Sequence, residues 1–153
     1  MIVSRFAALI AAATLLFSSP ALAASKSFED ALQSSSELYE QGRFQEVIPL
    51  AKKALAIAER QIGTDDAAFA SLLENLATVY EAELQYDKAH PLYQRALDIR
   101  VKVYGSNPPE VVNSLLNLTL IYDALGDYGS AGQMDVRATE IIEANNREQP
   151  QQG

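Results

Sequence analysis

The chain has no cysteine, and this absence excludes several kinds of structure. No disulfide framework can form, so packing alone must hold the fold. Zinc sites built on cysteine pairs are excluded, and the single histidine, His90, cannot make a His-Glu-x-x-His metal motif. The acidic residues lack the spacing of a calcium-binding loop, and the glycines form no phosphate-binding loop. We therefore expect no metal and no cofactor.

Basic residues are also scarce, with 12 lysines and arginines against 20 acidic residues and a net charge of −8. Nucleic acids and anionic membrane surfaces both attract clustered lysine and arginine. The composition therefore argues against either as a partner.

Residues that could carry out catalysis are missing as well. A Ser-His-Asp site would have to use His90, which lies beside Pro91 with no motif around it. Catalysis also needs a positioned nucleophile, so a packing or surface histidine is the favoured interpretation. The chain is not predicted to be an enzyme.

The one long apolar run lies at the N-terminus, at residues 6–17, behind Arg5 and ahead of small residues that end at Ala23. This is the layout of a secretory signal peptide. The run is about 12 residues, whereas a membrane-spanning helix needs roughly 20, so a membrane anchor is the weaker interpretation. No cysteine stands at the cleavage site, which excludes a lipoprotein. We predict that residues 1–23 are removed and that the mature protein is periplasmic or secreted, without membrane contact.

A repeat of 42 residues runs through the remaining chain. Shifting the sequence by this distance aligns Pro49 with Pro91 and Tyr80 with Tyr122. Further pairs are Leu50/Leu92, Leu55/Leu97, Gly63/Gly105, Leu73/Leu115, Asn75/Asn117, Leu76/Leu118, Ala82/Ala124, Tyr86/Tyr128 and Ala89/Ala131, and two positions recur in three copies, Ala54/Ala96/Ala138 and Ile57/Ile99/Ile141. Self-similarity at a fixed period is the signature of a repeat architecture.

Each copy is predicted to form two helices, because apolar residues such as Leu76 and Tyr80 recur at helical spacing. The first helices are expected at about 28–40, 65–82 and 107–124, and the second helices at about 45–61, 87–103 and 129–144. The turns near Gly42 and Gly126 are short, so the two helices of a pair must be antiparallel neighbours. Small residues such as Ala96 are expected where helices cross closely.

The residues that recur at these positions resemble the tetratricopeptide repeat family. They are Leu76, Ala77, Tyr80, Tyr86, Ala89, Tyr93 and Ala96 in the middle copy, and Leu118, Tyr122, Gly126, Tyr128, Ala131 and Ala138 in the third. A period of 42 rather than 34 is similar to the kinesin-light-chain-type subfamily. The resemblance implies an all-α fold, an α-solenoid of about three helix-turn-helix repeats in a right-handed superhelix.

The predicted domain covers residues 24–145, with repeats at about 28–63, 64–105 and 106–145. The outer copies carry polar residues such as Ser34, Asp135 and Thr139 where the middle copy is apolar. Terminal repeats of a solenoid need a polar outer face, so we expect a complete short solenoid. Residues 146–153 lack apolar side chains and are expected to form a disordered tail.

The resemblance also implies a binding surface, because the first helices of such repeats line a concave face. Helical spacing predicts that this face presents Tyr39, Ser71, Glu74, Asn75, Thr78, Asn113, Leu116, Asn117, Leu120 and Asp123, with Glu29, Leu32, Gln33, Ser36 and Glu81 beside them. Family members use an asparagine at the place of Asn75 and Asn117 to bind the backbone of an extended peptide. An amide both donates and accepts, so it suits any sequence. The alternative is an inter-helix hydrogen bond that fixes the repeat geometry.

The implied partner is another protein or a peptide segment. The charged residues predicted on this face, such as Glu74 and Asp123, are all acidic, so a neutral or basic segment fits better than an acidic one. Two alternatives stay open. One is a self-assembly module, a homo-oligomer that stacks through Met134, Val136, Ile141 and Ile142. The other is an accessory scaffold for a cell-envelope enzyme.

Overall fold

The computed structural model describes residues 26–106 and 108–148, and this part of the chain is almost entirely helical. The helices are α3 (Lys26–Glu40), α4 (Phe44–Ile62), α5 (Ala67–Ala82), α6 (Tyr86–Tyr104), α7 (Val112–Leu125) and α8 (Tyr128–Glu148), with a 3-10 helix, η1 (Pro109–Val111), before α7. These residues contain no strand. The predicted signal peptide lies outside them.

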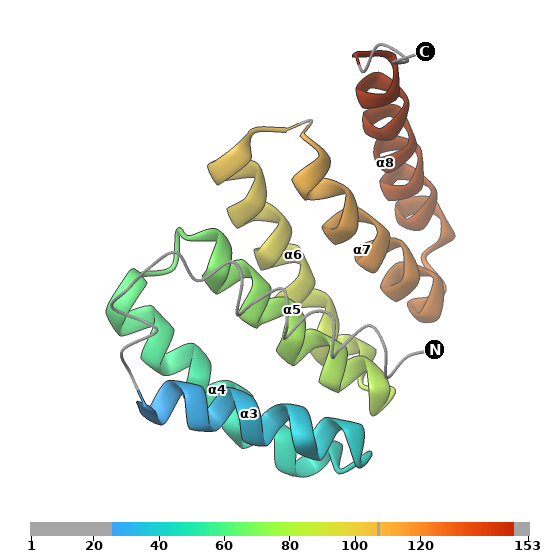
Figure 1. Cartoon of the computed structure of the whole chain (residues 1–153). Coiled ribbons are helices and arrows are strands. Elements are labelled where there is room, and N and C mark those ends of the chain that lie inside the picture. The colour runs from blue at the N-terminus through green and yellow to red at the C-terminus, as the bar shows by residue number, and fades with distance from the viewer. Residues whose placement is uncertain (1–25, 107, 149–153) are drawn as a thin grey trace, which may run out of the picture.

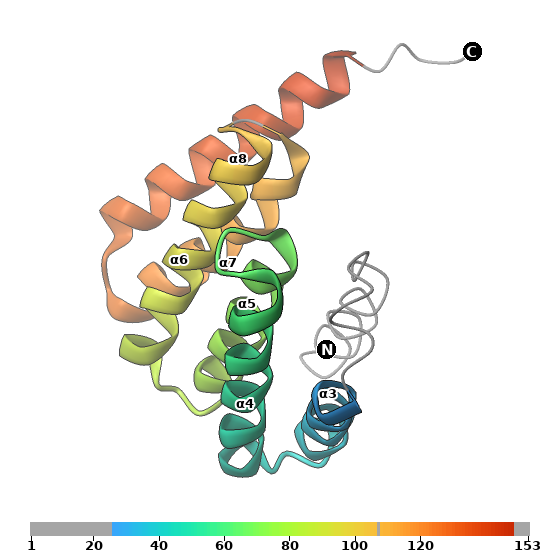
Figure 2. The same cartoon turned by 90° about the vertical axis from the view of Figure 1, so that its left-hand side faces the viewer.

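The helices form three antiparallel pairs that are stacked in chain order. Figure 1 shows the pairs fanned out from α3 and α4 to α7 and α8. The view at right angles shows α3 at one end of the stack and α8 at the other (Figure 2). Each helix packs mainly against its neighbours in the chain. The structure is therefore the all-α solenoid that the sequence predicts.

The turns inside the pairs follow the 42-residue period closely. Gly42, Leu84 and Gly126 all have positive φ, at 72°, 57° and 81°. At each of them the following amide closes the preceding helix by donating to a carbonyl five residues back, as Gln85 does to Tyr80 (2.8 Å). The same backbone device therefore ends the first helix of every repeat.

Two of the predicted first helices begin later than expected. The Asp66 side chain accepts the Ala68 amide at 2.7 Å, so α5 begins at Ala67 rather than at residue 65. Pro108 is extended (φ −79°, ψ 158°) because it precedes another proline, and α7 begins at Val112 after η1 rather than at residue 107. Residue 107 itself is outside the described residues.

The last helix is longer than predicted. α8 continues to Glu148, past the expected end at residue 144 and into the segment 146–153 that was expected to be a disordered tail. Side chains of the last turns make additional bonds within the helix there, since the Asn145 amide donates to Ile141 O (2.8 Å) and Arg147 donates to Glu143 O (3.2 Å). The remaining tail residues, 149–153, lie outside the described residues.

The core lies between the helices, and its close contacts are made by alanines. Ala77, Ala89 and Ala96 are fully buried, as predicted for positions where helices cross. One apolar cluster joins the first two pairs around Phe69 and Leu73, and a second joins the last two pairs around Leu118. These clusters fix the first helices relative to one another, and so they fix the candidate site.

Candidate functional site

A buried ion pair occupies the polar side of α5. Arg100 of α6 donates to Glu74 from Nη2 (2.8 Å) and from Nε (3.2 Å). The same guanidinium donates to Ser71 Oγ at 3.0 Å. Only 3% of the Glu74 side chain and 13% of the Arg100 side chain are exposed. The network therefore ties α6 to α5.

The third pair joins the same network through Ser114 of α7, whose hydroxyl donates to Glu74 Oε1 at 2.5 Å. The prediction that Ser71 and Glu74 offer polar groups to a ligand is therefore wrong for these two residues. Their groups hold three helices together, because a carboxylate that is buried must be paired. Spacing within the first helices did not reveal Arg100, since it comes from a second helix.

Thr78 is used in a similar way. Its hydroxyl donates to Glu74 O at 2.9 Å, and its Oγ1 lies 2.9 Å from the Tyr93 hydroxyl. Tyr93 of α6 donates in turn to Glu81 Oε2 at 2.8 Å. Burial raises the pKa of Tyr93 above its usual value, and the negative charge of Glu81 raises it further. Thr78 and Glu81, both half-buried, thus contribute to the contact between α5 and α6.

The structure also corrects the predicted position of Tyr39 on the concave face. Its side chain is 1% exposed and packs in a small apolar cluster with Val47 and Val79. The Phe44 ring lies edge-on to it, with 5.0 Å between the ring centroids. Burial raises the pKa of Tyr39, and Glu81 adds to the effect. Tyr39 therefore belongs to the core between the first two pairs.

Asn75 differs from its polar neighbours on α5. The residue is 5% exposed, yet neither its amide nitrogen nor its amide oxygen has a hydrogen-bond partner among the described residues. The inter-helix hydrogen bond considered as the alternative role is therefore not formed within this part of the chain. A buried polar group without a partner costs about 1–3 kcal/mol, so its presence needs an explanation.

The predicted residues of α7 remain available. Asn113, Leu120 and Asp123 are exposed, and Leu116 and Asn117 are half-buried. Neither asparagine forms a hydrogen bond with another of the described residues. Because Ser114 reaches Glu74, α7 lies directly beside α5. The structure thus brings Asn75 and the five α7 residues together on two neighbouring helices, and this set is called the α5–α7 face below.

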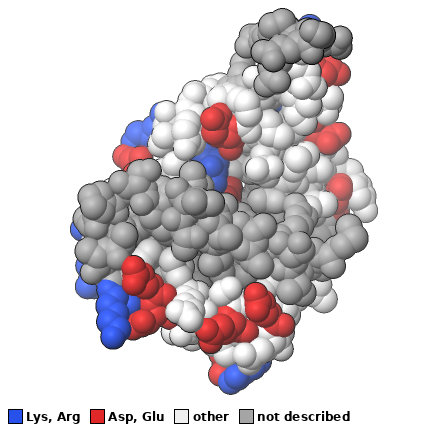
Figure 3. Space-filling model, viewed as in Figure 1, with Lys and Arg blue, Asp and Glu red and all other residues white. Residues whose placement is uncertain are grey.

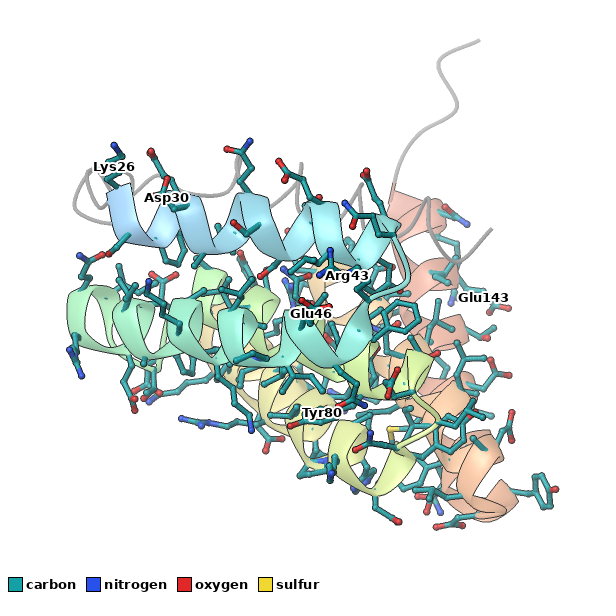
Figure 4. The ribbon with its side chains drawn as sticks, turned by 90° about the horizontal axis from the view of Figure 1, so that it is seen from below. Lys26, Asp30, Arg43, Glu46, Tyr80 and Glu143 are labelled. Atoms are coloured by element: carbon teal, nitrogen blue, oxygen red, sulfur yellow. The ribbon has the colours of Figure 1, made fainter. Side chains whose placement is uncertain are left out.

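Basic residues are concentrated on the second helices of the pairs. They are Lys52, Lys53 and Arg60 on α4, Lys88, Arg95, Arg100 and Lys102 on α6, and Arg137 and Arg147 on α8. Arg100 and Lys102 pair with Glu74 and Asp65, and Arg43, just before α4, pairs with Glu46 (2.6 Å; Figure 4). By contrast, α5 and α7 contain no lysine or arginine. The α5–α7 face therefore carries one free acidic side chain, Asp123, once Arg100 has neutralised Glu74.

His90 is half-buried against Tyr122, edge to face, with 4.9 Å between the ring centroids. Its Nε2 is buried and has no hydrogen-bond partner in the described segments. The same segments hold no group of three or more potential metal-ligating side chains. His90 is a packing residue between α6 and α7.

The proposed self-assembly patch on α8 is divided by the fold. Ile141 is buried and Met134 packs against the same core cluster, whereas Val136 and Ile142 are exposed. Two of its four residues are therefore committed to contacts within the chain. Among the helices described, none is long and apolar enough to cross a membrane.

Comparison with known proteins adds a family match. The family model described as "Tetratricopeptide repeat" matches residues 35–100 and again residues 68–144. A solved structure, BtubC (BKLC) from P. vanneervenii, is similar in fold, with a TM-score of 0.69 and 26% sequence identity. The likeness covers 78% of this chain but 48% of that one, so this chain spans about half the length of its structural relative. Among curated proteins no match was found.

Proposed function

Because the chain belongs to the tetratricopeptide repeat family, we propose that it is a protein-interaction module that binds a segment of another polypeptide on its α5–α7 face. Repeats of this family generally mediate contacts between proteins, and the fold is typically a non-catalytic scaffold. Beyond this general role, we specify which surface of this chain binds the segment and which side-chain groups recognise it.

The observation that carries the proposal is the Asn75 amide. It is buried, and both of its polar atoms lack a partner among the described residues, whereas Ser71 and Glu74 on the same helix are fully engaged. An extended peptide supplies both a carbonyl and an N–H, which are the two groups that an asparagine amide can bind. A bound backbone would therefore remove the cost of the unpaired amide.

The rest of the α5–α7 face fits the same ligand. Asn117 repeats the amide one period later on the neighbouring helix, and Leu116 and Leu120 offer apolar contact beside it. The one free charge is that of Asp123. We infer that the bound segment is neutral or basic rather than acidic, because an acidic segment would be repelled and would find no cation on α5 or α7.

We place this module outside the cytoplasm, in the periplasm or secreted, on the strength of the signal-peptide pattern in residues 1–23. Mass spectrometry of the exported protein is expected to find an N-terminus at Ala24 or within a residue or two of it. Recovery of only the full-length chain, from membranes, would contradict this placement.

The binding site is tested by titration. A partner captured from an extract is reduced to its binding segment, and calorimetry compares wild-type protein with the Asn75→Ala, Asn117→Ala double variant. We expect binding to weaken by about 1–3 kcal/mol for each lost hydrogen bond. The matched control is Asn145→Ala, which removes an amide whose partner is a carbonyl of its own helix. Equal affinity of the double variant and the wild type would refute the site.

A further inference from the structure

Exposed apolar side chains are concentrated on the last helical pair. Of the eight large hydrophobic residues exposed in the described part of the chain, five lie on α7 or α8: Leu120, Leu125, Tyr128, Val136 and Ile142. Tyr128 is 73% exposed, the largest fraction among them. Exposed apolar residues mark an interaction surface where they share one face of the molecule.

The internal repeat shows which part of the chain covers the aromatic residues at the positions equivalent to Tyr128. Each second helix begins with an aromatic residue, Phe44, Tyr86 or Tyr128. Phe44 packs against a cluster that contains Val79 of the next pair, and Tyr86 packs against a cluster that contains Ile121 of the next pair. Tyr128 occupies the same position and is exposed. The aromatic side chain is therefore placed to receive a following helix.

The C-terminal part of α8, around Ile142, also lacks the helix that covers the equivalent position in the middle repeat. Ile142 is the equivalent of Arg100, which lies where Glu74 of α5 meets Ser114 of α7. At the position of Glu74, the last pair has Leu116. In the last pair, Leu116 and Ile142 thus stand where the middle repeat has the polar network that α7 covers. No helix of the described residues covers Leu116 and Ile142 in that way.

We propose that this end surface docks an amphipathic α-helix of another polypeptide, with basic residues flanking its apolar stripe. The end surface consists of Leu116, Leu120, Tyr128, Asp135, Thr139 and Ile142. Leu116 and Leu120 also belong to the α5–α7 face, whereas Tyr128 and Ile142 belong to the end surface alone. The template for the ligand is α7, which covers the equivalent surface of α5 and α6. It does so with Leu115, Leu118 and Ile121, each three residues after the one before, so the docked helix needs the same spacing.

The negative charge of the end surface determines which kind of helix would dock there. Asp135 lies within the end surface, with Asp123 and Glu143 near its border, and the surface contains no lysine or arginine. Figure 3 shows acidic and uncharged side chains on the side of the molecule where Figure 1 places the lower part of α8, and Glu143 projects outward from α8 in Figure 4. A helix with basic flanks would therefore be attracted and oriented.

A second copy of the chain fits less well. The outward residues of α3 at the opposite end of the stack include Glu29, Asp30, Glu37 and Glu40. Head-to-tail stacking would set these carboxylates against the acidic end surface, and a symmetric contact would set the end surface against itself. Like charges placed together oppose association, so the occupant is a different polypeptide.

The test uses a fluorescent synthetic peptide, helical by design, with leucines at the spacing of the α7 stripe and lysines on both flanks. Fluorescence anisotropy with the purified protein at low salt is expected to show saturable binding. Substituting glutamate for the lysines should weaken binding by about tenfold or more. Ile142→Ala and Tyr128→Ala should each weaken it by about fivefold or more, because each removes an apolar contact from the docking surface.

The matched control is Val103→Ala on α6, because Val103 and Ile142 are both 43% exposed. It should change affinity by less than about twofold, as expected for a surface substitution outside the site. Circular dichroism should show that all three variants are folded, since each removes an exposed side chain.

Three results of the peptide titrations would overturn the proposal: no saturable binding, equal binding of the lysine and glutamate peptides, or equal losses from Ile142→Ala and Val103→Ala. Light scattering that shows a dimer, and a return to monomer in the Ile142→Ala variant, would identify a second copy as the occupant and would likewise overturn it. The Asn75→Ala, Asn117→Ala variant should bind the helical probe as the wild type does. Failure of the end surface is thereby distinguished from failure of the α5–α7 face.

Discussion

Leu84 is a position where a single substitution in a turn should make the protein more stable. It has φ 57°, whereas the equivalent positions in the other two repeats are glycines, Gly42 (φ 72°) and Gly126 (φ 81°). A left-handed conformation costs an L-residue roughly 1–2 kcal/mol. The Leu84 side chain is 71% exposed, so replacing it with glycine sacrifices little burial.

The net effect follows from two opposing terms. Leu84→Gly relieves the backbone cost but gives back about 0.5–1 kcal/mol, because glycine has more freedom in the unfolded chain. We expect a gain of about 0.5–1 kcal/mol in the free energy of unfolding, measured by urea denaturation followed by circular dichroism. In a thermal scan this corresponds to a rise in Tm of about 2–5 °C for a domain of this size.

The reverse change at the equivalent position is the control. A Cβ added at Gly126 would meet no atom within 4 Å, so Gly126→Ala tests the backbone conformation alone. It should lower stability by about 1 kcal/mol. If Leu84→Gly instead lowers the free energy of unfolding, the reasoning is refuted, and the leucine side chain must hold a contact that outweighs the strain.

Further substitutions test the packing and the polar networks. Ala96→Leu should cost about 1–3 kcal/mol of unfolding free energy, because Ala96 is fully buried, and Ala82→Leu should cost less, because Ala82 is half-buried; the opposite order in thermal melts would contradict the helix packing. Arg100→Ala should cost about 3–5 kcal/mol in urea denaturation, because it leaves Glu74 buried without its cation, and a second change, Glu74→Leu, should recover part of the loss. Tyr93 has a pKa raised in the folded state, so its contribution to stability is complete below the unfolded value of 10.0 and is lost as pH rises beyond it, by up to about 1.4 kcal/mol per pH unit. Urea denaturation at about pH 8.5 and about pH 10.5 should therefore show a smaller loss in Tyr93→Phe than in wild type; equal losses would mean that Tyr93 is not held protonated.

The repeat made most of the fold predictable. Matching positions such as Ala96 and Tyr80 fixed both the helical periods and the buried face, and the structure places both residues in the core. The limits of the helices were less accurate, because they depend on local chemistry: the Asp66 cap delayed α5, and two successive prolines delayed α7. Helical spacing reports which residues share a face, but it reports helix ends only weakly.

The candidate site was predicted only in part, for a different reason. Spacing within one helix identifies a polar face but not what a neighbouring helix brings to it. Ser71, Glu74 and Thr78 were predicted to share an open polar face with Asn75, yet Arg100 and Tyr93 of α6 engage all three of them. A comparison of repeats offered one usable signal. Glu74 and Arg100 are replaced together, by Leu116 and Ile142, as expected of two residues in contact.

The unfolding free energy of Asn75→Ala tests the central claim most directly, because the two roles of this amide predict opposite signs. If the amide is reserved for a peptide, the free protein loses an unpaired buried polar group and gains a better helix former. Its stability should then rise, by about 1 kcal/mol or more. If the amide ties neighbouring helices together, the same substitution should lower stability by a similar amount. A fall in the free energy of unfolding, measured by urea denaturation without any partner present, would contradict the account.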